Sequence, residues 1–156
     1  MKEYLELTLM TLQTLSDQAA KPIDQTAYLA SLMTAANQGY LFEYRNNQQL
    51  LGYFTVENME NQKWFVPILV IHPNHRTKSV FTALLEQFIQ FIEARQVLTL
   101  VSHALKNNVL SVNFHKRLGF KIIRENQAAF EFQLDINAAT KQTWRSFYAP
   151  RIHPHG

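Results

Sequence analysis

The residues best suited to chemistry lie in a short polar turn, His72-Pro-Asn-His-Arg-Thr-Lys-Ser79. An apolar, β-branched run ends just before this turn and a long amphipathic run follows it, which predicts strand, turn and helix. The first N–H groups of a helix have no partner within the helix, and the helix dipole is positive at that end. With Arg76 and Lys78 beside it, the turn is a candidate anion site, and a pyrophosphate would supply the acceptors. For the turn alone, a solvated basic loop with a capping Ser or Thr is the other interpretation.

A second patterned segment covers residues 108–120 and reads N-x-x-S-x-x-F-H-K-R-L-G-F. Taken by itself, it predicts an amphipathic helix that ends at Gly119 and a strand that opens at Phe120. The chain therefore has the order strand, basic turn, long helix, strand and then this motif. The combination is more specific than either segment alone.

Together the two segments resemble the GNAT superfamily of acyl-CoA-dependent N-acyltransferases. The first signature of that family is V-x-P followed by R-x-x-G-x-G/A and a helix, and it is matched by Ile71-His-Pro73 and Arg76-Thr-Lys-Ser79-Val-Phe81. The second signature is N-x-x-A/S-x-x-hydrophobic-Tyr-x-x-hydrophobic-Gly-Phe, and it is matched in register over residues 108–120. Since the element order from residue 40 to residue 134 also fits, the resemblance covers most of the chain.

The resemblance implies an α/β fold, and more specifically an α+β fold built on a mixed sheet. A mostly antiparallel sheet would be flanked by helices, and the parallel strands 63–72 and 97–102 would splay apart around a CoA cleft. It also implies acetyl-CoA as co-substrate. The activity implied is that of an N-acetyltransferase, in which a primary amine of a small-molecule or protein acceptor attacks the thioester directly in a ternary complex.

The same resemblance implies which residues hold the CoA. Backbone groups of Leu69, Val70 and Ile71 would hold the pantetheine, and Asn108 and Ser111 would lie near it. The pyrophosphate would be held by backbone amides of the turn, which belong to Arg76, Thr77, Lys78, Ser79, Val80 and Phe81. Pro67 agrees with this independently, because a proline cannot donate to a ladder and in mid-strand it marks a bulge or an unpaired edge.

Two residues of the turn depart from the family pattern. Ser79 and Phe81 replace both glycines of the pyrophosphate loop, where the lack of a side chain permits close approach. The Ser79 hydroxyl could itself donate to a phosphate. The Phe81 ring must turn into the core or crowd the phosphates, and its place in an apolar stripe with Leu84, Leu85 and Phe88 favours the core.

Three residues are candidates for catalysis. His115 stands where the family usually has a tyrosine that protonates the departing CoA thiolate, and an imidazole with an ordinary pKa near 6.5 is able to do so. A structural histidine on a helix is the alternative. Glu57, at the end of the strand 50–57, and His103, just after the strand 97–102, are the candidates for a general base. A surface carboxylate and a loop histidine are the alternatives for these two residues.

The remaining patterns predict the elements that must position these residues. Helices are expected over 4–19, between an N-cap at Asp24 and a stop at Gly39, over 79–95 and over 108–118. Strands are expected over 40–45, 50–57, 63–72, 97–101, 120–124 and 129–134, with turns at Asn46-Asn47 and over 58–62. After Asp135 a short helix and an extended end are expected.

Length indicates a single domain over 1–156, with N-terminal helices (1–38), a sheet core carrying the acyl-CoA site (40–135) and a C-terminal tail (136–156). A composition of 47% hydrophobic and 17% charged residues, without a long apolar run or a signal-like N-terminus, predicts a cytoplasmic globular protein with no membrane segment. Zero cysteines exclude disulfides and cysteine nucleophiles, and the histidine spacings match no compact ligand motif, so no metal is expected. A net charge of +3 is too small to predict a nucleic-acid-binding surface.

Two functions remain open at this point. The first is the N-acetyltransferase described above. The second is a non-catalytic GNAT-like binding or interaction module with weak or no CoA binding, which Phe81 and the absent tyrosine favour. The aromatic-rich tail 144–156 would then be a partner or homodimer surface, and packing against its own sheet is the alternative.

Overall fold

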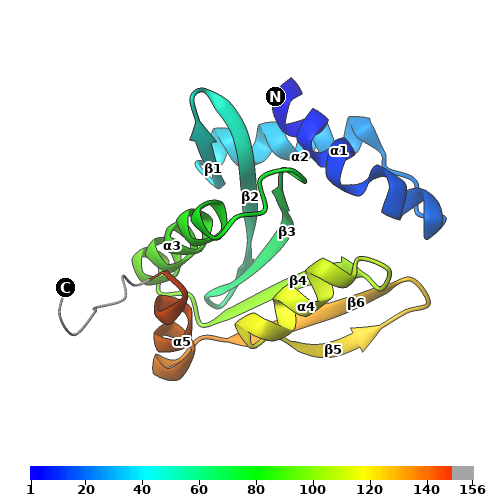
Figure 1. Cartoon of the computed structure of the whole chain (residues 1–156). Helices are drawn as coiled ribbons and strands as arrows, with labels where there is room; N and C mark the ends of the chain where they lie inside the picture. The colour runs from blue at the N-terminus through cyan, green and yellow to red at the C-terminus, as the bar shows by residue number, and fades with distance from the viewer. Residues whose placement is uncertain (149–156) are drawn as a thin grey trace.

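The structure is a computed structural model that describes residues 1–148. An apolar strand with a proline in its middle lies at the centre of the fold. This strand is β3 (Lys63–Ile71), and the elements before it are α1 (Lys2–Gln18), α2 (Gln25–Gln38), β1 (Leu41–Asn46) and β2 (Gln49–Glu60). The elements after it are α3 (Lys78–Arg95), β4 (Thr99–Leu105), α4 (Val109–Leu118), β5 (Lys121–Glu125), β6 (Ala129–Asp135) and α5 (Ala138–Tyr148) (Figure 1). Every helix and strand predicted from the sequence is present, although some boundaries differ.

The strands form one six-stranded mixed sheet in the order β1-β2-β3-β4-β6-β5. All neighbouring strands are antiparallel except β3 and β4, which are parallel. Parallel neighbours need a crossover connection, and α3 supplies it. The mixed α/β fold with one parallel pair is therefore confirmed.

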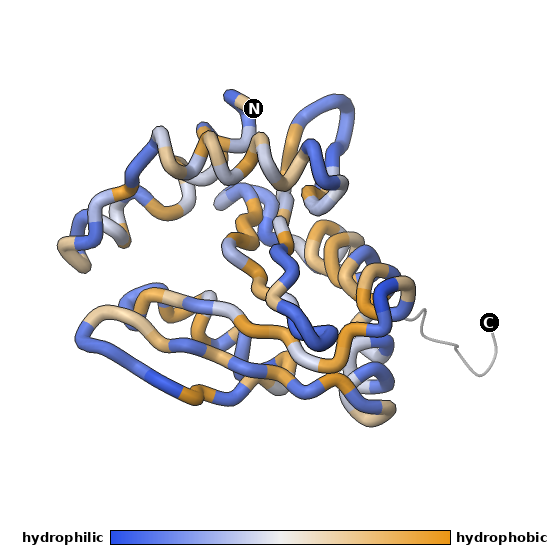
Figure 2. The backbone as a smooth tube through the Cα atoms, turned by 180° about the vertical axis from the view of Figure 1, so that it is seen from behind, coloured by the Kyte–Doolittle hydropathy of each residue, from blue (hydrophilic) through white to orange (hydrophobic). Residues whose placement is uncertain are grey.

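Helices cover both faces of this sheet (Figure 1). A small core lies between α1, α2 and the strands β2 and β3, and the main core lies between the sheet and α3, α4 and α5. Figure 2 shows hydrophobic stretches along α3 and along the strands, as expected for elements that pack on one another. None of the described helices is long and apolar enough to cross a lipid bilayer.

Two-residue turns close both N-terminal hairpins, at residues 47–48 and 61–62. All four residues have positive φ, between 51° and 68°, which is the left-handed geometry of tight hairpin turns. The turn predicted at 46–47 is thus displaced by one residue, because residue 46 still pairs with β2. The turn predicted over 58–62 was too long, because β2 continues to Glu60.

Pro67 lies in a bulge of β3. On β2, Thr55 and Glu57 are two residues apart, whereas their partners on β3, Ile68 and Phe65, are three residues apart. One extra residue therefore sits in β3 at the proline, which has no N–H to give to the ladder. The predicted mid-strand bulge is confirmed.

The bulge changes which side chains of β3 face the main core. Trp64 and Val66 face it before the proline, whereas Leu69 and Ile71 pack against it afterwards. The parallel ladder between β3 and β4 ends at the pair of Val66 and Ser102. Beyond this pair the two strands separate (Figure 1), so the edge of β3 that faces β4 has no strand beside it in the part of the chain that the structure describes.

Side-chain caps and glycines set the helix ends. Asp24, Thr77 and Asn108 each accept a hydrogen bond from the backbone N–H three residues further on, at the starts of α2, α3 and α4. Gly39 ends α2 with φ of 77° and Gly119 ends α4 with φ of 99°, a conformation that favours glycine. The predicted cap at Asp24 and both predicted glycine stops are confirmed.

The strand predicted over 97–101 was wrong in its position. β4 runs from Thr99 to Leu105, because Leu98 is still in the connection and its N–H donates to the Gln62 carbonyl. The ladder with β6 then continues as far as Leu105. His103 consequently lies within the strand, and its predicted place in a following loop was wrong.

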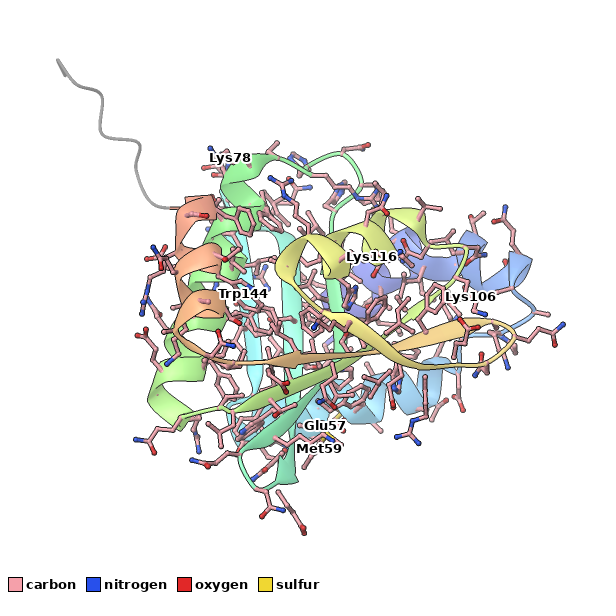
Figure 3. The ribbon with its side chains drawn as sticks, turned by 90° about the horizontal axis from the view of Figure 1, so that it is seen from below. Glu57, Met59, Lys78, Lys106, Lys116 and Trp144 are labelled. Atoms are coloured by element: carbon pink, nitrogen blue, oxygen red, sulfur yellow. The ribbon has the colours of Figure 1, made fainter. Side chains whose placement is uncertain are left out.

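The first part of the C-terminal tail packs on the protein's own core. Trp144 of α5 is 1% exposed, and its ring N–H donates to the Leu118 carbonyl at 2.8 Å (Figure 3). Arg145 forms an ion pair with Glu93 of α3. The predicted short helix is therefore confirmed, and the extended end predicted beyond it lies outside the described residues.

Candidate functional site

A cleft of about 1000 Å³ opens where β3 and β4 separate. Its walls come from α1, α2, β3, α3, β4, α4 and α5, so segments far apart in the sequence meet there. The predicted site residues that line it are Leu69, Val70, Ile71, Arg76, Thr77, Lys78, Phe81, His103, Asn108, Ser111 and His115. Of the other predicted residues, Val80 is buried in the main core, and Ser79 and Glu57 do not line the cleft.

The free edge of β3 turns peptide groups into the cleft. The His72 N–H donates to the Leu51 carbonyl on β2 at 2.7 Å. Peptide groups alternate in direction along a strand, so those of Val70 also point to β2, whereas those of Leu69 and Ile71 point to the free edge. A ligand that carries amide groups in an extended chain can pair with such an edge as a further strand would.

The start of α3 lies at one end of the cleft. The Thr77 side chain accepts from the Val80 N–H at 3.4 Å, so the N–H groups of Lys78 and Ser79 are left without a partner among the described residues. Arg76 and Lys78 are exposed beside them, and Figure 3 shows Lys78 at the outer end of the helix. Free N–H groups, the positive end of the helix dipole and two cations make this end a suitable place for an anion.

The ring of Phe81 lies between three helices. It is half-buried, with its centroid 4.8 Å from that of Phe114 on α4 and 6.5 Å from that of Phe147 on α5. It packs against the main core and also forms part of the cleft wall. The orientation toward the core that the sequence predicted agrees with these contacts.

His115 is held by polar contacts at both ring nitrogens. Its Nδ1 lies 2.7 Å from the Ser111 carbonyl oxygen, and its Nε2 lies 2.8 Å from Oγ of Ser102. A carbonyl only accepts hydrogen bonds, so Nδ1 carries a hydrogen and donates it. The ring also stacks on Phe132, with 4.4 Å between the centroids and 12° between the planes. These contacts fix the position and the tautomer of the imidazole.

The same surroundings lower the pKa of His115. Burial is the main cause, because it disfavours the charged ring, and the hydrogen bond to the Ser111 carbonyl acts in the opposite direction. At neutral pH the ring is therefore uncharged, with a lone pair on Nε2. In this state Nε2 accepts the hydrogen of the Ser102 hydroxyl.

Ser102 was missed by the sequence analysis. It is 6% exposed, lines the cleft and belongs to the last pair of the β3–β4 ladder. The available signal was a single hydroxyl on the buried side of a strand, between Leu100 and Ala104. Nothing in the sequence pattern placed it beside His115, which comes from another element.

The other two predicted catalytic residues are not among the residues that contact His115. His103 lies on the opposite side of β4 from Ser102, and its Nε2 is 3.1 Å from a carboxylate oxygen of Glu131. Glu57 is exposed on β2, and Figure 3 shows it far from Lys78 and the start of α3. The structure therefore brings His115 and His103 to the cleft but leaves Glu57 outside it. Within residues 1–148, no group of three or more His, Asp or Glu side chains is arranged to hold a metal ion.

The other end of the cleft is formed by α1, the connection after it and the first turns of α2. Its lining is mixed polar and apolar, and consists of Thr11, Leu12, Ser16, Lys21, Pro22, Ile23 and Tyr28. The Asn107 side chain donates to the Leu15 carbonyl at 2.9 Å and so ties α1 to the connection between β4 and α4. This end offers space for a second molecule, and Lys21 is the charged side chain that lines it.

Comparison of the sequence with known families gives a match to the acetyltransferase (GNAT) domain over residues 1–135. The match runs from α1 to the end of β6, so it includes both walls of the cleft up to α5. Among curated proteins, no sequence matches the chain significantly.

Solved structures share the fold. The PaiA N-acetyltransferase from Thermoplasma acidophilum, in complex with coenzyme A, has a TM-score of 0.70 at 12% identity, covering 86% of this chain and 92% of that chain. The ribosomal-protein-S18-alanine N-acetyltransferase from Escherichia coli has a TM-score of 0.65 at 20% identity, covering 86% of both chains. YncA from Salmonella typhimurium, with its cofactor acetyl-CoA, has a TM-score of 0.57 at 18% identity, covering 74% of this chain and 75% of that chain. At these identities the likeness concerns the fold.

Proposed function

Since the chain belongs to the GNAT family of acetyltransferases, we propose that it moves an acetyl group from acetyl-CoA to a primary amine, by direct attack in a ternary complex. The observation that carries this proposal is the cleft between β3 and β4, which has free peptide groups along one wall and, at one end, a helix start with two free N–H groups and two exposed cations. Solved proteins of the same fold contain coenzyme A or acetyl-CoA.

The pantetheine of acetyl-CoA would lie along the free edge of β3. Its two amide groups would pair with the peptide groups of Leu69 and Ile71, which point into the cleft. Asn108 and Ser111 line the facing wall at the start of α4 and would border the same chain. The thioester would then lie near the end of the β3–β4 ladder.

The pyrophosphate would lie at the start of α3. The N–H groups of Lys78 and Ser79 would donate to its oxygens, and Arg76 would add a cation. The side chain of Ser79 would remain at the surface, so Ser79 would contribute through its backbone N–H only. Val80 is buried in the core and its N–H already donates to the Thr77 side chain, so we propose no contact between Val80 and the pyrophosphate.

The chemistry needs an uncharged amine at the thioester carbon. Attack forms the C–N bond, the carbonyl oxygen becomes an oxyanion, and the C–S bond breaks to release CoA as a thiolate. The amine gives up a proton and the thiolate takes one. We propose that His115 handles this proton, because its imidazole is anchored next to the cleft. His103 is the second candidate base, on the other side of β4, and for Glu57 we propose no role.

The acceptor amine would enter between α1 and α2. The residues there include Tyr28, Thr11, Ser16 and Lys21. A small molecule carrying one primary amine fits this mixed lining. A protein N-terminus or a lysine side chain presents the same amine.

The proposal is tested by incubating the protein with acetyl-CoA and a panel of primary amines that includes amino acids, polyamines, aromatic amines and short peptides. Release of free thiol is followed over time, and the acetylated amine is identified by its added mass. Amine-dependent thiol release with a matching product supports the proposal. Silence across the whole panel contradicts it.

A non-catalytic CoA-binding or interaction module is the second candidate, and the phenylalanine at position 81 favours it. Thermal unfolding with and without CoA separates the candidates, because ligand at about 100 times its dissociation constant adds about 2.7 kcal/mol of stability. A rise in Tm with CoA but no transfer indicates a binding module. No rise at millimolar CoA indicates an interaction module that has lost the ligand.

A further inference from the structure

We propose that Ser102 and His115 form a single proton relay, which takes the proton from the attacking amine and returns it to the departing thiolate. This inference rests on the acetyl transfer proposed above and names the groups that carry its proton. Ser102 would contact the reacting atoms, and His115 would act through it.

The position of Ser102 is the first observation behind the relay. Its hydroxyl lies on β4 at the last residue pair before β3 and β4 separate, and it lines the cleft. His115 comes from α4, and its Nε2 ends 2.8 Å from this hydroxyl. The imidazole is therefore hydrogen-bonded to a hydroxyl in the cleft, and through Ser102 it can exchange a proton with a ligand that it does not contact itself.

The direction of the hydrogen bonds is the second observation. Nδ1 of His115 is committed as a donor to the Ser111 carbonyl, so in the uncharged ring Nε2 has a lone pair and accepts from Ser102. This arrangement is a hydroxyl next to a base that is itself oriented by a third group. An uncharged His115 cannot donate from Nε2 first, so it has to begin the cycle as a proton acceptor.

The cycle balances for both bonds. As the amine nitrogen attacks and the C–N bond forms, Ser102 Oγ takes a proton from that nitrogen and passes its own proton to Nε2. When the C–S bond breaks, the imidazolium returns a proton to Oγ and Ser102 gives one to the sulfur. The products are the amide and CoA with a free thiol, and both side chains end as they began. One hydroxyl can serve both steps because the nitrogen and the sulfur are bonded to the same carbon of the intermediate.

The relay also provides a base on the face of β4 that carries Ser102, where neither Glu57 nor His103 provides one. Glu57 lies outside the cleft, and His103 is bound to Glu131 on the opposite face of β4. The groups that contact the His115 ring are Ser102 and Ser111 together with the rings of Phe114, Phe120 and Phe132. The charged neighbours along α4, Lys116 and Arg117, are exposed. Among residues 1–148, no charged side chain contributes to the lowered pKa of His115.

The kinetic test compares Ser102→Ala, His115→Phe and the double variant with the wild type, using an amine that the wild type acetylates. Each single variant should lower kcat by about 100-fold or more, and the double variant should be no slower than the worse single variant, because the two groups act as a unit. Ser102→Thr keeps a hydroxyl and should recover most of the rate. The acidic limb of the kcat profile, where His115 becomes charged, should disappear in His115→Phe. A Ser102→Ala enzyme with wild-type kcat, or losses that multiply in the double variant, would overturn the relay.

A second measurement does not depend on transfer activity. In protein labelled with ¹⁵N at the histidine rings, the relay predicts that His115 is uncharged at neutral pH with its hydrogen on Nδ1. It also predicts that Ser102→Ala and the addition of CoA each shift the Nε2 signal. A hydrogen on Nε2, or a signal that does not respond to bound CoA, contradicts the relay whether or not the wild type turns over. A wild type without amine-dependent thiol release but with the predicted signals contradicts the proposed function instead.

Discussion

The ring of Phe81 stands edge-on to the ring of Phe114, with 4.8 Å between the ring centroids and 87° between the planes. One ring comes from the first turn of α3 and the other from α4, so the contact joins two helices that border the same cleft. Edge-to-face pairs of this kind contribute beyond the area that they bury. The sequence analysis predicted that Phe81 replaces a family glycine, and in the structure its ring contributes to helix packing.

Phe81→Ala should therefore lower the free energy of unfolding by about 2 kcal/mol, since it removes a half-buried ring from a junction of three helices. Urea unfolding at neutral pH measures this loss. Phe81→Leu is the matched control and should lose less, because it keeps most of the apolar volume. An alanine variant with unchanged stability and much tighter CoA binding would contradict the packing role and would indicate that the ring crowds the ligand.

Arg76→Ala and Lys78→Ala should each weaken CoA binding several-fold, because both cations lie beside the free N–H groups at the start of α3. Binding of pantetheine, which lacks the pyrophosphate, should hardly change. Lys121→Ala is the control, since Lys121 is also exposed but lies on β5 and does not line the cleft. Calorimetric titration at low and at higher salt measures the affinities. Equal losses for CoA and pantetheine would count against a pyrophosphate site at this helix.

Acidification should destabilise the protein through His115. Its pKa is lowered in the folded state, so below an ordinary value of 6.5 the unfolded chain binds more protons than the folded chain at this site. The free energy of unfolding then falls as pH falls through this range, by at most about 1.4 kcal/mol per pH unit for one group. Urea unfolding of the wild type and of His115→Phe is measured between about pH 7.5 and pH 5, a range that brackets the ordinary histidine pKa. The two proteins are compared by how steeply the free energy of unfolding changes with pH. The slope of the wild type should be steeper, and parallel curves would contradict the burial of this imidazole.

Gly52→Ala should destabilise the protein and loosen β3. A Cβ atom at Gly52 would lie 2.9 Å from a methyl carbon of Leu84 and 3.1 Å from the Val70 carbonyl oxygen. Because Gly52 pairs with Ile71, the strain falls on the strand that borders the cleft. A loss of about 1–3 kcal/mol in urea unfolding and weaker CoA binding are expected. Gly39→Ala is the control, since it meets no atom within 4 Å and costs only the strain of a φ of 77°. It should lose some stability but leave CoA binding unchanged.

Local signals in the sequence predicted the fold well. Pro67 predicted the bulge because a proline inside an apolar run has few other places in a sheet. Asp24, Gly39 and Gly119 predicted helix ends because each satisfies a backbone requirement that depends on its own neighbours only. The elements that were displaced, such as the strand predicted over 97–101, had boundaries set by pairing with a distant strand, which is not visible locally.

The sequence predicted most of the candidate residues that the structure places along the cleft, but not the polar contacts among them. The turn and α3 share one stretch of chain, so Arg76 and Lys78 became candidates through their own neighbours in the sequence. The hydrogen bond between His115 and Ser102 joins residues on different elements, so it depends on how α4 packs against β4. His103 was a candidate for its residue type alone, and its partner Glu131 is set by the pairing of β4 with β6.

The amide NMR spectrum during a titration with acetyl-CoA tests the central claim most directly, because it locates the ligand without requiring turnover. A saturable titration is predicted in which the largest shifts belong to the amides of Leu69 and Ile71 on β3 and of Lys78 and Ser79 at the start of α3. Amides of the exposed strand β5 should stay unchanged. A spectrum that does not change at millimolar acetyl-CoA, or shifts that gather away from the β3–β4 cleft, would contradict the claim that this cleft is an acyl-CoA site.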